Sequence, residues 1–180
     1  VVPELPQIAF GIVGEPTQMN PAIAEKGLLV LDCTSYGKAG HAARNEGENA
    51  IYKAIKDIEW FRTYEFPQTS DLLGPVKMTV SMVSAGTQHN VVPDKCDFVV
   101  DVRSNELYSN EELYHIIDKH TDCEVKPRSF RLNSSRISLE NPFVQRAIII
   151  GKIPYGSPTL SDQTFMPFPT LKMGPGDSAR

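Results

Sequence analysis

The sequence has few of the features that mark secreted, membrane-spanning or nucleic-acid-binding proteins. Its three cysteines are far apart and form no CxxC spacing, so we interpret them as small buried side chains in a reducing compartment. No stretch approaches the roughly 18 apolar residues that span a bilayer, and the first residues lack the basic-then-apolar order of a signal peptide. A net charge of −4 provides no basic stripe for nucleic acid. These absences predict a cytoplasmic protein with no nucleic-acid or membrane partner.

The composition that remains is that of an ordinary globular protein. Of the 180 residues, 41% are hydrophobic and 22% are charged, enough for one large domain or two small ones. The first residue, Val1, is not a methionine, and the chain stops at Arg180 just after a glycine-rich turn. We therefore expect a piece of a longer polypeptide.

Alternating apolar and polar residues mark the strands of a central module. Residues 76–82 and 96–102 place every second side chain on an apolar face, as expected for half-buried strands. Residues 28–36 and 123–132 are the other two expected strands. Pro127 cannot donate a backbone hydrogen bond, so the last strand should lie at a sheet edge.

Two helices separate these strands. Apolar residues recur at helical spacing between residues 49 and 64, and Ser109 to Glu112 form a capping-box sequence before a second amphipathic segment. The resulting order is β-α-β-β-α-β. That order predicts an antiparallel four-stranded sheet with both helices on one face, the ferredoxin-like arrangement.

The flanks of this module have a different pattern. Residues 8–13 form an uninterrupted apolar run, typical of a strand covered on both faces. Residues 143–150 resemble a short helix, and residues 169–173 a strand that leads into a glycine-rich turn. We predict an α+β ferredoxin-like module inserted in part of an α/β domain, with boundaries at 1–27, 28–138 and 139–180.

Two residues are presented as candidate functional groups. Glu15 comes just after the first apolar run, in Gly14-Glu15-Pro16-Thr17, and His41 follows Gly37 and Gly40 in the segment 37–43. Glycine lets the backbone turn and approach closely, and functional groups concentrate at strand ends and on loops. A carboxylate in this position can equally cap a turn, and a lone histidine can be structural.

Eight short motifs occur in one order along the chain and resemble the second half of the M20 family of zinc-dependent amidohydrolases. The most similar members are acetylornithine deacetylases and succinyl-diaminopimelate desuccinylases. The motifs are Gly14-Glu15-Pro16-Thr17, Ala24-Glu25-Lys26-Gly27, Gly40-His41-Ala42-Ala43, Asn49-Ala50-Ile51, Asn90-Val91-Val92-Pro93-Asp94, Asp101-Val102-Arg103, Leu160-Ser161-Asp162 and Gly174-Pro175-Gly176-Asp177.

The resemblance implies a catalytic domain with two zinc ions and an inserted ferredoxin-like lid that forms a homodimer. By resemblance, Glu15 is a carboxylate ligand of one metal ion, for which zinc is expected and cobalt is possible. His41 matches the lid histidine that stabilises the oxyanion in the partner subunit's site. Asn90 and Arg103 match substrate-binding positions, although either can also be an ordinary surface residue. The implied reaction is hydrolysis of the amide bond of an N-acyl amino acid.

The chain departs from this family pattern in its metal ligands. No HxD motif precedes the first of these eight motifs, and the one adjacent glutamate pair, Glu111-Glu112, lies in the expected helix cap. The histidine that normally follows the last glycine-rich motif is absent before Arg180. Since a catalytic zinc uses about three protein ligands, we expect this chain alone to be inactive and essentially metal-free.

Two other interpretations stay open. The chain can be a ferredoxin-like module for dimerisation or small-molecule binding, which explains the β-α-β-β-α-β order but not the motifs around Glu15 and Gly174. Within the enzyme class, an M20 dipeptidase or carboxypeptidase shares the same scaffold.

Overall fold

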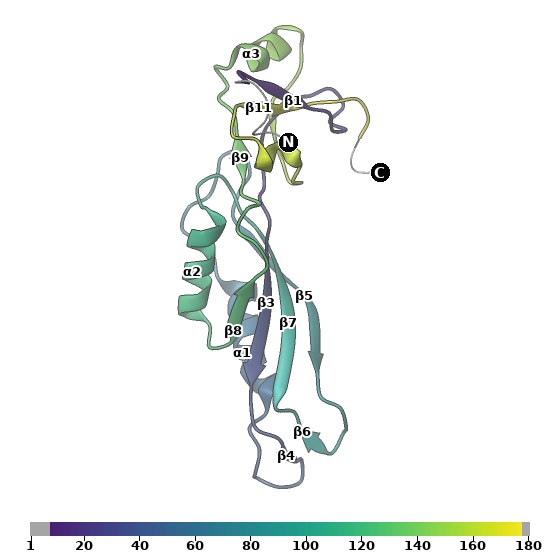
Figure 1. The fold of residues 1–180 in the computed structure, drawn as a ribbon, viewed down its shortest axis with the longest axis vertical. Helices are drawn as coiled ribbons and strands as arrows, with labels where there is room; N and C mark the ends of the chain where they lie inside the picture. Colours follow the sequence, from purple (N-terminus) through teal and green to yellow (C-terminus); the bar gives the residue numbers. More distant parts are fainter. Residues whose placement is uncertain (1–7, 178–180) are drawn as a thin grey trace.

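The computed structural model describes residues 8–177 and shows an elongated molecule with two sheets (Figure 1). One sheet has four strands, most of them long, and two helices pack against it; we call it the larger sheet. The other has five short strands from both flanks of the chain, and we call it the smaller sheet. Within residues 8–177, all four strands of the larger sheet lie between Leu29 and Pro127. The fold prediction of an inserted α+β module is therefore confirmed.

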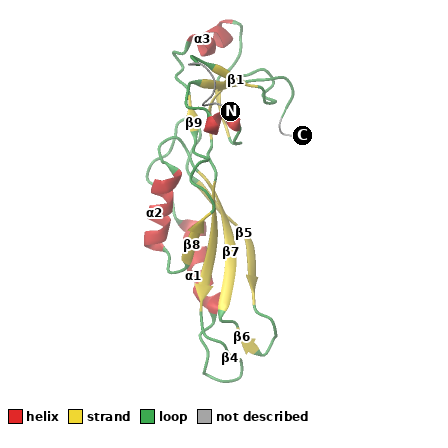
Figure 2. Cartoon of the chain, viewed as in Figure 1, coloured by secondary structure: helices red, strands yellow, loops and turns green. Residues whose placement is uncertain are grey.

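The larger sheet is antiparallel and has the strand order of a ferredoxin-like fold, β5-β7-β3-β8. Helices α1 and α2 cover one face of it, as Figure 2 shows. The strand β8 lies at an edge, as Pro127 predicts. The elements are β3 (Leu29–Tyr36), α1 (Ala50–Thr63), β5 (Lys77–Ala85), β7 (Lys95–Arg103), α2 (Asn110–His120) and β8 (Glu124–Pro127).

Alternation along β3 and β7 creates the core between sheet and helices. Every second side chain of these strands is buried, and both helices direct their apolar stripes at them. Burying one such side chain contributes about 1.5–3 kcal/mol. The most buried members of this core are Leu29, Leu31, Cys33, Ala54, Phe61, Cys96, Phe98, Val100, Val102, Leu113 and Ile117.

Helix α2 begins where its capping box predicts, and the structure shows that α1 also begins at a capping residue. Asn49 accepts a hydrogen bond from the backbone N–H of Ile51 at the start of α1. At the start of α2, the Ser109 hydroxyl accepts from the N–H of Glu112, and the Glu112 carboxylate accepts from the N–H of Ser109. These bonds satisfy backbone donors that a helix leaves unpaired.

One detail of the strand prediction is wrong. The alternation placed Met82 on the apolar face with Val80, but β5 is irregular between these residues, and they pair with the neighbours Val99 and Val100. An extra residue in one strand reverses the facing of the side chains beyond it. Met82 is 65% exposed, and Val83, which pairs with the buried Phe98, is itself 58% exposed.

The smaller sheet joins the two flanks of the chain. β1 (Gly11–Val13) pairs in parallel with β11 (Thr170–Lys172), and β2 (Ala22–Glu25) connects β11 to β10 (Tyr155–Ser157) and to β9 (Ser135–Arg136). α3 (Pro142–Ile149) packs beside it through Val144, which contacts Ile23 and Leu171 in a second, smaller core.

The first strand is shorter and less covered than predicted. Only residues 11–13 of the apolar run 8–13 are in a strand, and Ile12 is 61% exposed. The expectation of a strand covered on both faces is therefore wrong for the described residues. The predicted helix at 143–150 and strand at 169–173 are confirmed as α3 and β11.

A two-stranded ribbon forms the far tip of the larger sheet, at the end opposite the smaller sheet (Figure 1). It consists of β4 (Gly40–His41) and β6 (Val91–Val92). Of the helices between residues 8 and 177, none is long and apolar enough to cross a membrane.

Candidate active-site residues

Glu15 lies in the loop that follows β1 of the smaller sheet, directly beside the glycine-rich turn near Gly174. Its backbone N–H donates to the carbonyl of Val13 at 3.1 Å, which turns the chain out of β1. A Cβ atom at Gly174 would come within 2.6 Å of the Glu15 carbonyl oxygen, so only glycine permits this approach. Thr17 exchanges hydrogen bonds with the backbone of Gly174 at 3.1 and 3.3 Å. The fold thus brings the first and last motifs together.

The residues described here do not complete a metal site around Glu15. Between residues 8 and 177, no three side chains of His, Cys, Asp or Glu are grouped closely enough to hold an ion. One carboxylate falls short of the roughly three protein ligands of a catalytic zinc. Any metal bound at Glu15 must obtain its other ligands from outside this part of the chain, so we derive no chemical step through a metal.

His41 lies at the far tip, in the ribbon of β4 and β6. The backbone N–H of Ala43 donates to His41 Nδ1 at 3.2 Å, which makes Nδ1 the acceptor. In the neutral ring, Nε2 then carries the proton. The side chain is exposed. His41 therefore presents an N–H donor to a surface outside its own loop.

Asn90 is held next to this histidine. Its carbonyl accepts a hydrogen bond from the N–H of Ala42 at 2.9 Å, and β6 follows directly at Val91. Its side chain is exposed. The tip thus brings together two of the residues singled out by sequence, which are 49 positions apart.

Arg103 lies elsewhere, at the end of β7 that is remote from the tip. Its guanidinium donates to both carboxylate oxygens of Asp101, at 2.7 and 2.9 Å. Both side chains lie on the face of the sheet opposite the helices, as the alternation predicted. The fork geometry leaves part of the guanidinium for a further acceptor.

Arg103 belongs to a group of cations that the sequence reasoning missed. Lys26 donates to the carbonyl of Pro75 at 2.9 Å. Burial, followed by the positive charges of Lys77 and Arg103, lowers the pKa of Lys26. These three side chains favour an anion at the junction between the two sheets. The motif that contains Lys26 was visible in the sequence, but its proximity to Arg103 depends on how the chain crosses between the sheets.

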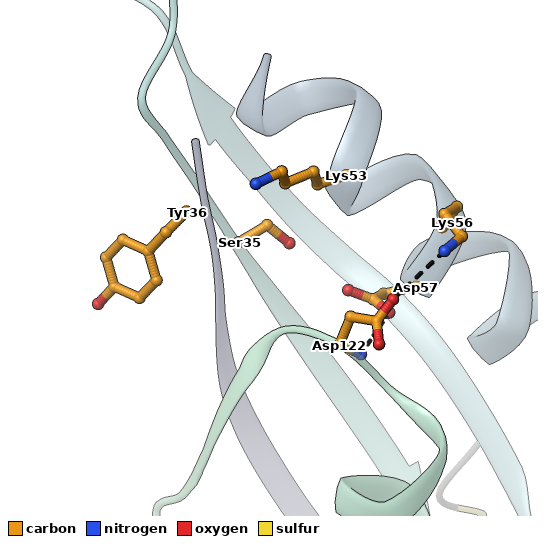
Figure 3. Close-up of a pocket in the computed structure, with 6 residues that line it drawn as sticks. All are labelled: Ser35, Tyr36, Lys53, Lys56, Asp57 and Asp122. Atoms are coloured by element: carbon orange, nitrogen blue, oxygen red, sulfur yellow. Dashed lines mark hydrogen bonds and ion pairs between the residues drawn. The ribbon is translucent and has the colours of Figure 1, made fainter. Parts of the chain in front are cut away.

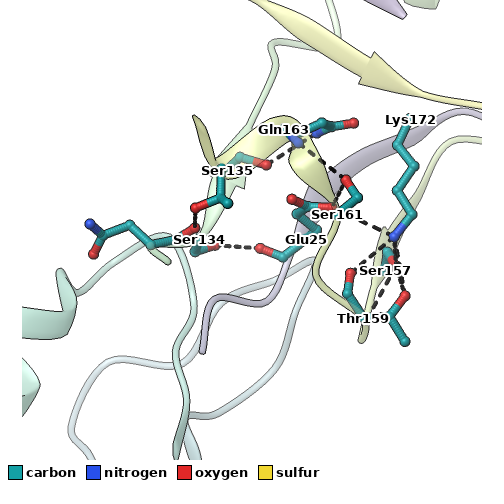
Figure 4. A network of polar contacts seen from close by, with 10 residues as sticks. Glu25, Ser134, Ser135, Ser157, Thr159, Ser161, Gln163 and Lys172 are labelled. Carbon is teal, nitrogen blue, oxygen red and sulfur yellow. Dashed lines mark hydrogen bonds and ion pairs between the residues drawn. The ribbon is translucent and has the colours of Figure 1, made fainter. Parts of the chain in front are cut away.

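A buried network fixes the segment around Ser161 against the smaller sheet (Figure 4). Lys172 is only 4% exposed and lies 3.5 Å from the buried carboxylate of Glu25. Its ammonium also donates to Ser157 Oγ and to the carbonyl of Thr159, both at 3.0 Å. Ser161 Oγ donates to Glu25 Oε2 at 2.7 Å. The motifs around Glu25 and Ser161 are therefore neighbours in space.

The candidate residues occupy three separate places in one chain. Glu15 lies beside the smaller sheet, Arg103 near the junction, and His41 with Asn90 at the far tip (Figure 1). A single chain therefore does not bring the histidine to the carboxylate.

Residues 23–128, more than half of the chain, match the sequence pattern of the M20 peptidase dimerisation domain. The chain belongs to the M20 peptidase family.

Curated relatives of this M20 chain are named as amide hydrolases. It is 26% identical over 137 residues to a succinyl-diaminopimelate desuccinylase from Wolbachia pipientis subsp. Culex pipiens, a match that covers 72% of this chain and 34% of that one. It is 30% identical over 99 residues to an acetylornithine deacetylase from Myxococcus xanthus, covering 51% and 26% respectively. The chain thus spans about a third or less of the length of these relatives.

Solved structures of M20 peptidases share the fold. A tripeptidase from Staphylococcus aureus superposes with a TM-score of 0.72 at 18% identity, over 97% of this chain and 50% of that one. A dinuclear metal-binding M20 peptidase from Bacillus subtilis gives 0.58 at 16% identity, over 92% and 47%. At these identities the likeness establishes the fold alone.

Proposed function

We propose that this M20 chain is the lid, with part of the catalytic domain, of a zinc-dependent amidohydrolase that cleaves N-acyl amino acids, as acetylornithine deacetylases do. The observation that carries the proposal is the tip, where a protonated Nε2 of His41 and the side chain of Asn90 face outward from a rigid sheet. These side chains cannot act beside Glu15 of their own chain, because Glu15 lies at the other end of the molecule.

In this proposal the tip of one subunit serves the site of another. His41 donates a hydrogen bond to the oxyanion that forms when water attacks the amide carbonyl, a contribution of about 3–4 kcal/mol to the barrier. Asn90 and Arg103 hold the substrate, with Arg103 binding its carboxylate. Glu15 is one ligand of a zinc site completed by residues outside this chain. A homodimer through the lid satisfies this geometry.

Exposed apolar side chains around the smaller sheet support a larger protein. Contiguous apolar patches on a soluble surface usually mark contacts with another element or chain. In this proposal the other half of a catalytic domain packs against this surface. The chain spans about a third or less of the length of its relatives, which agrees with this arrangement. The exposed residues are Ile12, Phe143, Ile149, Ile150, Ile153 and Phe165.

The three cysteines support a reducing compartment, which is why we place the enzyme in the cytoplasm. Cys33, Cys96 and Cys123 are all buried and none forms a disulfide. Unpaired thiols of this kind are typical of proteins kept reduced.

The direct test uses the full-length protein that contains this chain. We expect it to release ornithine from N-acetylornithine or N-succinylornithine, and to lose this activity in a chelator and regain it with added zinc. The 180-residue chain alone should be inactive. Turnover of dipeptides instead would place the protein with the peptidases of the family.

A second candidate function is a ferredoxin-like module for dimerisation or small-molecule binding. It is favoured by one observation: the four strands and two helices enclose a core of their own. A full-length protein that dimerises but neither binds zinc nor hydrolyses any of these substrates would decide for this module.

A further inference from the structure

A cavity in the lid, lined by none of the candidate residues Glu15, His41, Asn90 and Arg103, has the features of a binding site. It has a volume of about 360 Å³, within the range of about 300–1,000 Å³ typical of small-molecule sites. It lies between α1, the end of β3 and the loop before β8 (Figure 3). Its lining is polar and charged, and consists of Ser35, Tyr36, Lys53, Lys56, Asp57 and Asp122.

The floor of the cavity contains two buried oxygen atoms that accept or donate no hydrogen bond within residues 8–177. Asp57 is 4% exposed, and its Oδ1 accepts from the N–H of Asp122 at 2.9 Å, but its Oδ2 has no partner. Ser35 is 3% exposed and its Oγ also has no partner. Buried polar groups are normally paired, and a buried charge without a partner is costly. Both atoms therefore call for a ligand group that donates hydrogen bonds.

The rim of the cavity carries two lysines, each of which is paired with an exposed carboxylate. Lys53 and Lys56 project from the same side of α1 as Asp57. Lys53 Nζ is 2.7 Å from Glu48 and Lys56 Nζ is 3.3 Å from Asp122, but the side chains of all four are at least half exposed. Exposed ion pairs contribute little stability, so either lysine can exchange its partner for a ligand at low cost.

We propose that this cavity binds an α-amino acid as a zwitterion. Its ammonium group would donate to Asp57 Oδ2 and Ser35 Oγ at the floor, and its carboxylate would bind Lys53 and Lys56 at the rim. A simple anion is disfavoured by the Asp57 carboxylate below, and a simple cation by the two lysines above. A molecule with an ammonium group and a carboxylate attached to the same carbon satisfies floor and rim together. This inference does not depend on the proposed enzymatic function.

The test is a titration of the ¹⁵N-labelled 180-residue chain, followed by amide chemical shifts, with alanine, serine, aspartate and ornithine as probes. At least one should produce saturable shifts at Ser35, Lys53, Asp57 and Asp122. Acetate and methylammonium, which each carry one of the two charges, should bind at least tenfold more weakly.

Variants locate the site. Asp57→Asn should weaken binding by at least tenfold, because it removes the charge that pairs with the ammonium group. Ser35→Ala, which preserves the core shape, should weaken it about threefold. Asp118→Asn, an exposed substitution on α2, is the matched control and should change nothing.

Several results would overturn the proposal. One is the absence of saturable shifts for every amino acid up to about 10 mM, where even a millimolar dissociation constant would be visible. Another is acetate or methylammonium binding as tightly as the amino acid. A third is binding that Ser35→Ala leaves unchanged, since this variant should fold even if Asp57→Asn does not.

Discussion

The His41 imidazole is oriented by a hydrogen bond from the protein backbone. Ala43 donates to Nδ1, and the carbonyl of the neighbouring Asn90 fixes the loop through Ala42. This arrangement fixes the tautomer as well as the position. It also makes the role of the side chain testable by simple truncation, because no packing is lost.

In the full-length protein, His41→Ala should lower kcat for N-acetylornithine by about 10²–10³-fold, the usual effect of removing one oxyanion donor. KM should change much less, because the donor acts mainly in the transition state. His115→Ala is the matched control, since His115 is an exposed histidine of α2 with no assigned role. An unchanged kcat in His41→Ala would exclude this role.

Glu25 and Lys172 form the most deeply buried ion pair among residues 8–177. Glu25→Gln leaves the Lys172 ammonium buried without its counter-charge, and we expect a loss of about 3–5 kcal/mol of local stability. Amide hydrogen exchange in β2 and β11 measures this directly.

The double variant Glu25→Gln/Lys172→Met is the control for that experiment. It removes both charges, so exchange in β2 should return most of the way to the wild-type rate. If Glu25→Gln alone leaves exchange unchanged, the pair does not stabilise the smaller sheet.

At the scale of helices and strands, the sequence predicted the features that depend on residues close to one another in the chain. Alternation identified β5 and β7, and the capping box at Ser109 marked the start of α2, because a cap acts within one turn. The irregularity before Met82 was not predictable, since it depends on which residues of β7 lie opposite. The contact of Glu25 with Lys172 joins positions 147 apart, which no local pattern encodes.

For the candidate site, the sequence likewise predicted which residues matter but not how they lie in space. Sequence motifs singled out Glu15, His41, Asn90 and Arg103, whose roles stay predictions, but gave no distances between them. The sequence did not show that Lys26 lies near Arg103, because these two cations come close only where the chain passes between the sheets.

Strand β5 is the edge of the larger sheet that is better suited to pairing with another copy. The other edge, β8, carries Lys126 and Pro127, which oppose strand addition. On β5, Met82 and Val83 are more than half exposed. Family membership in the dimerisation domain favours a dimer, and we propose that β5 lies at its interface.

Met82→Asp combined with Val83→Asp should weaken that dimer by roughly a hundredfold, because it places like charges opposite each other across the two-fold axis. Sedimentation of the 180-residue chain measures the dissociation constant. Lys126→Asp, on the opposite edge strand β8, is the control variant. Equal weakening by the control, or no weakening by the β5 variant, would move the interface elsewhere.

At the scale of the whole molecule, the separation of Glu15 from His41 predicts complementation between subunits. Glu15→Ala and His41→Ala proteins should each be inactive as homodimers. A mixed dimer has one site with both native residues and one with neither, so random exchange of full-length subunits should restore about a quarter of wild-type activity.

The outcome is specific to exchange between subunits. Wild-type protein mixed with either variant is the control for subunit exchange. Failure to recover activity after proven exchange would mean that both residues act within one chain.

The path of the chain into and out of the larger sheet has an evolutionary consequence. The N–H of Leu28 donates to the carbonyl of Leu132 at 2.8 Å, so the two ends of a segment of more than 100 residues lie side by side. Inserting or deleting a unit whose ends already touch does not stretch the host fold. An ancestor with only the smaller sheet could thus have acquired the lid in one genetic event, and descendants can replace it without redesigning what lies beneath.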